Sequence, residues 1–374
     1  MSAKVVFVTA ANILDKMGSG GVKASLEHLK FVQQCVGKDN VQVCTYIKQS
    51  EIQECNDMKI FIKEESNLRL LFSALFGCKV YLPWREKDLV QYINACDPDL
   101  LFLDYSVLGR LIKLKHSYKT VVFFHNIEAD YAWNKVKNEG IFYLPSYWAS
   151  RYNDKWASKA DKVICLNERD AVRLYECYGR KADLLIPITF EDLFEESCTT
   201  INYKREILFF GSLFPPNQFS IEWFIKNVMP KLKDIKLNIA GRDFEKKKEE
   251  YEQFPNVTVI GSVLNPADLY YRHSAVVLPI KYGAGMKVKT AEAMMYGRRI
   301  FAADEALEGY DIENIAGITR CNMAEEFADA INHYFDKEVQ RSFEPEIRYR
   351  FLEKYETNCV VNKFNGFINN FLRE

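Results

Sequence analysis

Short apolar runs rich in β-branched residues alternate with helical patterns along the chain, and this alternation constrains the fold more than any other feature. In the first half the apolar runs are KVVFVTAAN, NVQVCTYI, PDLLFLDY, KTVVFFHN and DKVICLN. Helical patterns such as GGVKASLEHLKFVQQ and ERDAVRLYECYG separate them. A second series contains ILFFGS, IKLNIAGR, VTVIGSV, AVVLPI and RRIFAAD. Strands joined through helices pair in parallel. The sequence therefore predicts an α/β fold with two Rossmann-like doubly wound domains.

The polar and acidic stretch from Thr189 to Glu206 separates the two series. A chain of 374 residues exceeds one comfortable core, so two domains with a cleft between them are expected. We predict an N-terminal domain over residues 1–190, a linker over 191–206 and a C-terminal domain over 207–350. A closing helix over 351–374 is expected to pack back towards the N-terminal domain, because its aromatic and aliphatic residues recur at helical spacing.

The charge and cysteine content exclude several classes of function. Lys and Arg total 50 and Asp and Glu total 51, so no overall field recruits nucleic acid or an anionic membrane. The ten cysteines form no CxxC pair or His/Cys cluster, which argues against zinc and against a disulfide framework. No secretory signal and no apolar run of roughly 18 residues is visible. We expect a cytoplasmic protein without metal or nucleic acid.

A glycine loop joins a strand to a helix in VVLPIKYGAGMKVKTAEAMMYG, Val276 to Gly297. Gly283 and Gly285 would let the backbone approach a phosphate closely. Lys287 and Lys289 stand in the first helical turn, where they oppose the helix dipole, so an anionic ligand should compensate them. The alternative is a structural turn with solvated lysines.

Glu292 follows Lys289 by three residues and shares its helix face. A carboxylate there would accept hydrogen bonds from sugar hydroxyls beside a diphosphate. Other strand ends of the second series also carry candidate donor residues. Gly211 and Ser212 end one strand and Asn217 follows them, Arg242 ends the next, and Ser262 and Val263 follow a third.

These segments resemble a GT-B fold glycosyltransferase of the family 4 type, the glycosyl transferases group 1. The resemblance runs over most of the chain, through GSGGVKASLEHL, FFHNIEADY, ADKVICLNERDAVRLYECYG, FFGSLFPPN and GAGMKVKTAEAMMYG, of which the last two are the most specific. It implies that a nucleotide diphosphate sugar, a co-substrate rather than a cofactor, lies against the C-terminal domain. The acceptor then lies against the N-terminal domain, and no metal is needed.

The resemblance also implies roles for single residues. Glu292 would hold the ribose, while Lys287 and Lys289 with the Gly285 loop would hold the diphosphate. The turn at Ser262 and Val263 would meet the edge of the base, with Arg242 beside it.

Two departures from the family pattern affect the donor site. Ala284 stands where the first of two glutamates is usual, so one contact to the donor sugar is missing or replaced. Ser212 and Asn217 stand where positive residues usually grip the diphosphate. Retention of configuration at the sugar is implied by the resemblance alone.

In the N-terminal half, the loop Gly18, Ser19, Gly20 and Gly21 follows the first strand, where it is either an approach to donor phosphate or acceptor or a flexible loop. His125 ends the strand KTVVFFHN, where similar enzymes bring a histidine to the donor sugar, and the alternative is a hydrogen-bonded structural histidine. Asn126 follows on the acceptor side. Glu128 is interpreted as a carboxylate at a helix N-terminus rather than an acceptor-side base.

The segment Lys135 to Lys159 mixes Tyr143, Tyr147, Trp148 and Trp156 with basic residues. Such a mixture suits a membrane interface, but we favour an amphipathic helix packed on the N-domain sheet. A lipid-linked acceptor and peripheral contact with the inner face of the membrane stay open.

We predict a hexosyltransferase-type enzyme that moves a sugar from a nucleotide diphosphate donor to a hydroxyl of a glycan or lipid-linked acceptor, in surface polysaccharide or glycoconjugate biosynthesis. His125, Lys289 and Glu292 are the predicted catalytic residues. Lysines and backbone amides would stabilise charge on the leaving diphosphate. The alternatives are a GT-B nucleotide-sugar epimerase and a non-catalytic GT-B partner subunit. An NAD-dependent dehydrogenase is disfavoured, because no GxGxxG follows the first strand.

Overall fold

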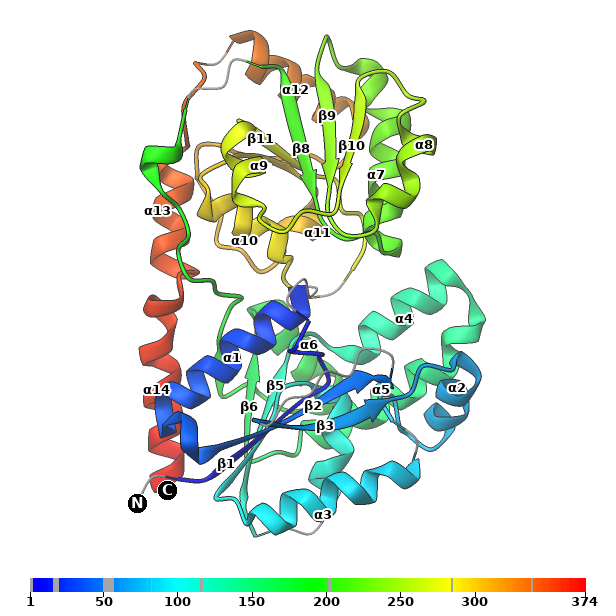
Figure 1. Cartoon of the computed structure of the whole chain (residues 1–374), viewed down its shortest axis with the longest axis vertical. Coiled ribbons are helices and arrows are strands. Elements are labelled where there is room, and N and C mark those ends of the chain that lie inside the picture. The colour runs from blue at the N-terminus through cyan, green and yellow to red at the C-terminus, as the bar shows by residue number, and fades with distance from the viewer. Residues whose placement is uncertain are drawn as a thin grey trace. The chain divides into compact units, whose positions relative to one another are not determined.

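The chain divides into two compact units (Figure 1). Unit 1 contains Met1–Pro187 and Val360–Glu374, and unit 2 contains Ile188–Cys359. The computed structural model describes residues 3–15, 20–49, 57–81, 83–114, 117–200, 204–283, 285–337 and 339–374. Ala284, Gly18 and Ser19, which the sequence analysis singled out, lie outside these residues.

The sheet of unit 1 is parallel and, in the described residues, has the strand order β3-β2-β1-β4-β5-β6-β7. Phe7 in the inner strand β1 lies opposite Val43 on one side and Phe102 on the other. Both faces of such a sheet are covered, so the central strands read as continuous apolar runs. The strands are β1 Val5–Thr9, β2 Val41–Lys48, β3 Met58–Lys63, β4 Leu100–Leu103, β5 Lys119–Phe124, β6 Lys162–Cys165 and β7 Leu184–Leu185.

Helices connect these strands on both faces of the sheet (Figure 1). They are α1 Gly20–Val36, α2 Asn67–Leu75, α3 Glu86–Cys96, α4 Glu128–Glu139, α5 Leu144–Ala157 and α6 Glu168–Tyr178. Short 3-10 helices cover Lys38–Asn40, Pro83–Arg85, Ser106–Lys113 and Ile141–Tyr143.

The sheet of unit 2 is also parallel, with the order β10-β9-β8-β11-β12-β13 in the described residues. The strand order reverses direction beside β8, and ligands of open α/β sheets bind at the carboxyl ends of strands near such a point. The strands are β8 Glu206–Phe210, β9 Lys236–Ala240, β10 Val257–Gly261, β11 Ala275–Leu278, β12 Arg299–Ala302 and β13 Ile318–Arg320.

The remaining helices follow the same alternation. They are α7 Pro215–Asn227, α8 Lys248–Tyr251, α9 Ala267–Arg272, α10 Val288–Met295, α11 Asp304–Leu307, α12 Ala324–Lys337, α13 Pro345–Lys354 and α14 Thr357–Arg373. Short 3-10 helices cover Glu196–Cys198, Met229–Lys231 and Phe244–Lys247.

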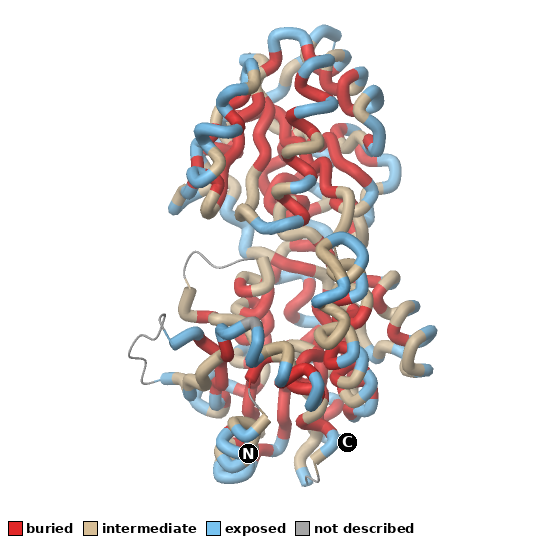
Figure 2. The backbone as a smooth tube through the Cα atoms, turned by 90° about the vertical axis from the view of Figure 1, so that its right-hand side faces the viewer, coloured by how far each residue is buried: buried red, intermediate tan, exposed pale blue. Residues whose placement is uncertain are grey.

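The core of each unit lies on its sheet, whose inner strands are buried in Figure 2. The predicted class, α/β with two Rossmann-like doubly wound domains, is confirmed. All ten β-rich runs of the sequence analysis contain strands. The strands β3, β7 and β13 were not predicted, because they lie at sheet edges or are very short and their residues are mostly half-buried.

Two segments next to the unit boundary have clear packing partners. The ring of Phe364 in α14 lies 5.4 Å from Phe31 of α1 and 6.1 Å from Phe102, all within unit 1. Asp192, in the expected linker, forms an ion pair with Arg348 of α13 at 2.7 Å within unit 2. Within the described residues, no helix is both long enough and apolar enough to cross a lipid bilayer.

Candidate functional site

The carboxyl ends of three neighbouring strands in unit 2 meet through bare backbone. The Gly211 N–H donates to the Ala240 carbonyl at 3.0 Å, and the Gly241 N–H donates to the Gly261 carbonyl at 2.8 Å. Gly241 has φ +128°, and a Cβ on it would lie 1.8 Å from the Gly211 carbonyl oxygen. Only glycine fits such a position. These glycines therefore allow the ends of β8, β9 and β10 to pack against one another.

Lys289 of α10 reaches the loop that follows β8. Its ammonium group donates to Asn217 Oδ1, and Asn217 Nδ2 donates to the Ser212 carbonyl at 2.7 Å. A Cβ on Gly211 would lie 3.2 Å from Lys289 Nζ, so the amine lies directly against this glycine. The structure thus brings together four predicted donor residues from separate segments of the chain.

The surroundings of Lys289 disfavour its charge. Burial lowers the pKa of the ammonium group, Lys287 lowers it further and Glu292 opposes them, so that the pKa falls to about 7. The ring of Phe209 lies 5.1 Å from Nζ. Because a nearby negative charge favours the protonated form of an amine, an arriving anion would restore the charge of Lys289.

Lys287 holds the glycine loop before α10. Its Nζ donates to the Gly285 carbonyl at 2.7 Å and to Glu305 Oε1 at 2.7 Å. A Cβ on Gly283 would lie 3.0 Å from Lys287 Cε, so the loop wraps closely around this side chain. The sequence analysis missed Glu305, which follows β12 and partly neutralises Lys287. This ion pair makes Lys287 a loop-holding residue as well as a phosphate candidate.

Glu292 is buried one turn beyond Lys289. One of its carboxylate oxygens accepts from the Tyr270 hydroxyl at 3.4 Å. The Tyr270 ring stacks on Tyr296 at 4.8 Å, and burial together with the Glu292 charge raises the pKa of the Tyr270 phenol well above its usual value. The hydrogen bond from Tyr270 is long, so a stronger donor such as a sugar hydroxyl could replace it.

The turn after β10 is occupied by a carboxylate. The Ser262 N–H donates to Glu245 at 3.2 Å, and the Ser262 hydroxyl donates to the same carboxylate at 3.1 Å. Arg242 is half-buried, and its carbonyl accepts from Leu213 N at 2.8 Å, which places its backbone beside the loop after β8. Val263 is half-buried. A ligand base that uses the Ser262 donors must therefore share them with Glu245, which sequence reasoning did not identify.

In unit 1, His125 is part of a buried network at the ends of three parallel strands. Asp104 Oδ1 is 3.0 Å from His125 Nε2 and 2.6 Å from His28 Nδ1, and Asp104 Oδ2 accepts from the Thr9 hydroxyl at 3.1 Å. The Tyr105 ring stacks on the His125 ring at 3.9 Å and 4°. The orientation of His125 is therefore set by a carboxylate on one edge and by an aromatic ring on one face.

The histidines determine the charge state of this network. Burial alone would raise the pKa of the Asp104 carboxyl, but His125 and His28 more than offset burial and hold the pKa well below its usual value. Burial lowers the pKa of the His28 imidazole, although Asp104 opposes that shift. Asp104 is therefore ionised, which fits its role as acceptor from both rings.

Among the described residues, only His28, Asp104 and His125 form a group of ligand atoms close enough together to hold a metal ion. His28, Asp104 and His125 each offer one ligand atom, and these atoms lie within 4.8 Å of one another. The hydrogen bonds to Asp104 account for the arrangement without an ion. Asp104, His28 and Thr9 escaped the sequence analysis, although Asp104 and Thr9 stand at the ends of adjacent predicted strands, which is the signal that would have found them.

The other predicted residues of unit 1 lie around this network in sequence. Gly20 and Gly21 begin α1, the helix that carries His28. Asn126 follows His125, and its Oδ1 is buried without a hydrogen-bond partner among the described residues. Glu128 begins α4 and forms an ion pair with Lys79 at 2.6 Å. The Lys79 contact favours the structural interpretation of Glu128.

Comparison with known proteins places this geometry in a family context. Residues 204–337 match the family model described as Glycosyl transferases group 1. No curated protein matches the chain by sequence.

Several solved structures share the fold. Sucrose-phosphate synthase from Thermosynechococcus elongatus is similar at a TM-score of 0.70 and 14% identity, with 99% of each chain covered. Anabaena HepE, solved with UDP and glucose, is similar at a TM-score of 0.67 and 15% identity, again with 99% of each chain covered. TarM from S. aureus is similar at a TM-score of 0.58 and 17% identity, with 72% of this chain covered. This chain spans about half of TarM, 54% of its length. At these identities the similarity shows the fold.

Proposed function

We propose that this chain, which has the GT-B fold and carries in residues 204–337 a domain of the glycosyl transferases group 1, is a nucleotide-sugar-dependent glycosyltransferase. The observation that supports it most is the meeting of Lys289, Asn217 and Gly211 at the carboxyl ends of the unit 2 strands, with Glu292 one helical turn away. This group offers a cation, bare backbone and a carboxylate, which together suit a diphosphate joined to a sugar.

The donor would bind to unit 2. Lys289 takes the charge of the diphosphate, and the bare backbone at Gly211, which lies against the Lys289 amine, leaves room for it. Glu292 exchanges its long hydrogen bond from Tyr270 for ribose hydroxyls. We take UDP as the first nucleotide to test, because HepE was solved with UDP and glucose.

Charge on the leaving diphosphate drives the proposed chemistry. As the bond between the sugar and the diphosphate breaks, negative charge grows on the phosphate oxygens, and a protonated Lys289 stabilises it where water is largely excluded. The proposed reaction uses no metal, since a protonated lysine supplies the positive charge. We propose retention of configuration on the basis of the family resemblance.

Unit 1 would supply His125 and bind the acceptor. The carboxylate of Asp104 and the ring of Tyr105 hold the imidazole in one orientation, which suits a residue that contacts a donor sugar. Gly20, Gly21 and Asn126 belong to the proposed acceptor side. The acceptor is a hydroxyl of a glycan or lipid-linked sugar, in surface polysaccharide or glycoconjugate biosynthesis, and the transferred group is a hexose.

We also propose peripheral contact of unit 1 with the inner face of the cytoplasmic membrane. The α2 segment exposes a row of large apolar side chains, with Leu68 79%, Phe72 49%, Leu75 73% and Phe76 55% exposed. An amphipathic helix of this kind can lie in a bilayer interface. The nine described cysteines are free thiols, in keeping with a cytoplasmic location.

The test is a screen of nucleotide sugars by thermal shift, followed by an assay of acceptor-dependent release of nucleoside diphosphate. A ligand at about a hundredfold excess over its Kd should stabilise the protein by about 2.7 kcal/mol. No shift with any uridine, guanosine or adenosine diphosphate sugar would contradict the proposal and favour a non-catalytic partner subunit. Interconversion of the sugar without acceptor would instead identify an epimerase.

A further inference from the structure

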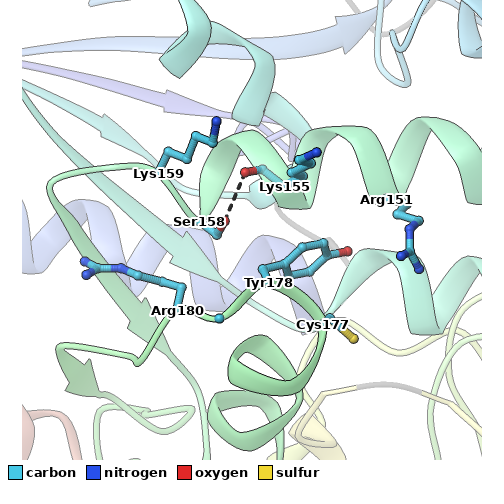
Figure 3. Close-up of a pocket in the computed structure, with 8 residues that line it drawn as sticks. Arg151, Lys155, Ser158, Lys159, Cys177, Tyr178 and Arg180 are labelled. Atoms are coloured by element: carbon cyan, nitrogen blue, oxygen red, sulfur yellow. Dashed lines mark hydrogen bonds between the residues drawn. The ribbon is translucent and has the colours of Figure 1, made fainter.

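Unit 1 contains a pocket of about 450 Å³ where the end of α5 meets the end of α6 (Figure 3). In Figure 3, Tyr178 lies between Arg151 and Arg180, and Lys155 and Lys159 lie alongside. All these residues line the pocket. It belongs to unit 1, whereas every predicted donor residue belongs to unit 2.

The pocket is strongly basic. Arg151, Lys155, Lys159 and Arg180 line it, and none of its described lining residues is acidic. Arg180 is already neutralised, because it forms an ion pair with Asp183 at 2.5 Å. The other three cations are exposed and come from one face of α5 or the turn after it, at a spacing of four residues.

The ordinary explanation is that these cations stabilise helix ends. Helices α5 and α6 end at Ala157 and Tyr178, and each carboxyl end carries a partial charge of about −0.5. Together they amount to about one negative charge, which only one cation would offset. The three cations besides Arg180 therefore leave a net charge of about +2 at the pocket, more than the helix ends require.

The size and the charge together identify the ligand class. A pocket of this volume falls in the range of small-molecule sites and is larger than one phosphate ion requires. A phosphate monoester carries about −1.5 to −2 charges at neutral pH, which matches the excess positive charge. The Tyr178 ring offers an apolar surface for the rest of such a molecule.

We propose that this pocket binds a phosphate monoester carried on a body the size of a sugar, held by Arg151, Lys155 and Lys159. The inference does not depend on the proposed transferase activity. The same chemistry has two sources, a soluble sugar phosphate and the headgroup of an anionic lipid. Either would give unit 1 a recognition site for phosphate that operates independently of the donor residues of unit 2.

The experiment is calorimetric titration with glucose 1-phosphate, with glucose as the uncharged control ligand. Wild type should bind the phosphate and not glucose, and affinity should fall as salt rises or as pH drops below about 6, where the phosphate loses its second charge. The variant Lys155→Gln/Lys159→Gln should bind at least tenfold more weakly. These side chains are exposed, and a cation at a helix end adds only slightly to stability, so the variant should stay folded. Unfolding melts check that a loss of binding does not come from misfolding.

Two control variants locate the site. Lys226→Gln removes an exposed cation of α7 in unit 2, and Lys289→Gln alters the donor residues, and neither should change the affinity for glucose 1-phosphate. If Lys289→Gln abolishes binding while Lys155→Gln/Lys159→Gln does not, the probe occupies unit 2 and the proposal is wrong. Absence of binding to wild type in both arms would also overturn it.

The second arm uses vesicles of phosphatidylcholine with and without phosphatidic acid, whose headgroup is a phosphate monoester. Binding to the acidic vesicles that requires Lys155 and Lys159, without binding of glucose 1-phosphate, assigns the pocket to a lipid headgroup. Binding of the soluble ester alone assigns it to a sugar phosphate. Vesicle binding that ignores both lysines, again without binding of the soluble ester, would contradict the proposal.

Discussion

At the scale of single residues, Glu292 is the most direct test of the donor site. Replacement by Gln keeps the shape and removes the charge, so binding of a UDP-sugar should weaken by about 1.5–3 kcal/mol, the strength of a charge-assisted hydrogen bond. Titration calorimetry measures this change. Glu249→Gln, an exposed carboxylate on α8, is the matched control and should bind as wild type. Equal affinity in both variants would remove Glu292 from the donor site.

The lowered pKa of Lys289 predicts that donor binding depends on pH. Its pKa is about 7 without ligand, and the anionic diphosphate raises it. Below pH 7 the amine is charged before binding, so the affinity for UDP-glucose should be constant. Above pH 7 binding must take up a proton, so the affinity should fall by up to about tenfold per pH unit.

Calorimetry between pH 6 and 8.5, in buffers of different ionisation enthalpy, would detect this proton uptake. Lys289→Gln should bind more weakly and show no such pH dependence. A wild-type affinity that stays level to pH 8.5 would mean that Lys289 does not contact the diphosphate.

At the scale of secondary structure elements, Asp104 after β4 joins the end of β1 through Thr9, the end of β5 through His125, and helix α1 through His28. Asp104→Asn removes the charge that both histidines bond, and it should lower the free energy of unfolding by about 2–3 kcal/mol. Denaturant unfolding measures it. Asp99→Asn, before the other end of β4, disturbs only one exposed hydrogen bond from Lys4 N and should cost less than about 1 kcal/mol. Equal costs would show that the buried network adds no special stability.

Glycine positions give a second test at the element scale. Gly241→Ala places a Cβ against the Gly211 carbonyl at a positive φ, so the ends of β8 and β9 must separate, at a cost of about 3 kcal/mol or more. Gly366→Ala in α14 meets nothing within 4 Å and should stabilise by about 0.5–1 kcal/mol. Thermal melts of the two variants should therefore shift in opposite directions. A Gly241→Ala protein as stable as wild type would refute the close packing of these strand ends.

At the scale of the whole molecule, the division of labour between the units predicts that binding and turnover separate. His125 belongs to unit 1, and the proposed donor residues belong to unit 2. His125→Ala should therefore leave UDP affinity within about twofold, while acceptor-dependent UDP release falls about 10²-fold, the scale of one positioned polar group. Normal turnover in a folded His125→Ala protein would remove this histidine from the reaction.

The candidate site was predictable from the sequence where its residues lie at the ends of strands or the start of a helix. Glycines at strand ends and lysines at a helix start can be recognised in the sequence itself. In the structure, Gly211, Asn217 and Lys289 do lie together. Glu305, Tyr270 and Glu245 could not be predicted. Their partners are Lys287, Glu292 and Ser262. Each contact joins residues 17 to 22 positions apart that meet only when the chain folds. A carboxylate or phenol in a loop or short helix carries no local pattern.

The sequence by itself determined the two parallel sheets, because apolar runs buried on both faces and amphipathic helices between them allow few other arrangements. Only the tertiary structure decided which polar side chains face one another. Asp104 lies between His28 and His125 because parallel pairing aligns the ends of β4 and β5 and places α1 beside them. The lowered pKa of Lys289 has the same origin, since burial and the approach of Lys287 exist only once α10 packs against the loop after β8.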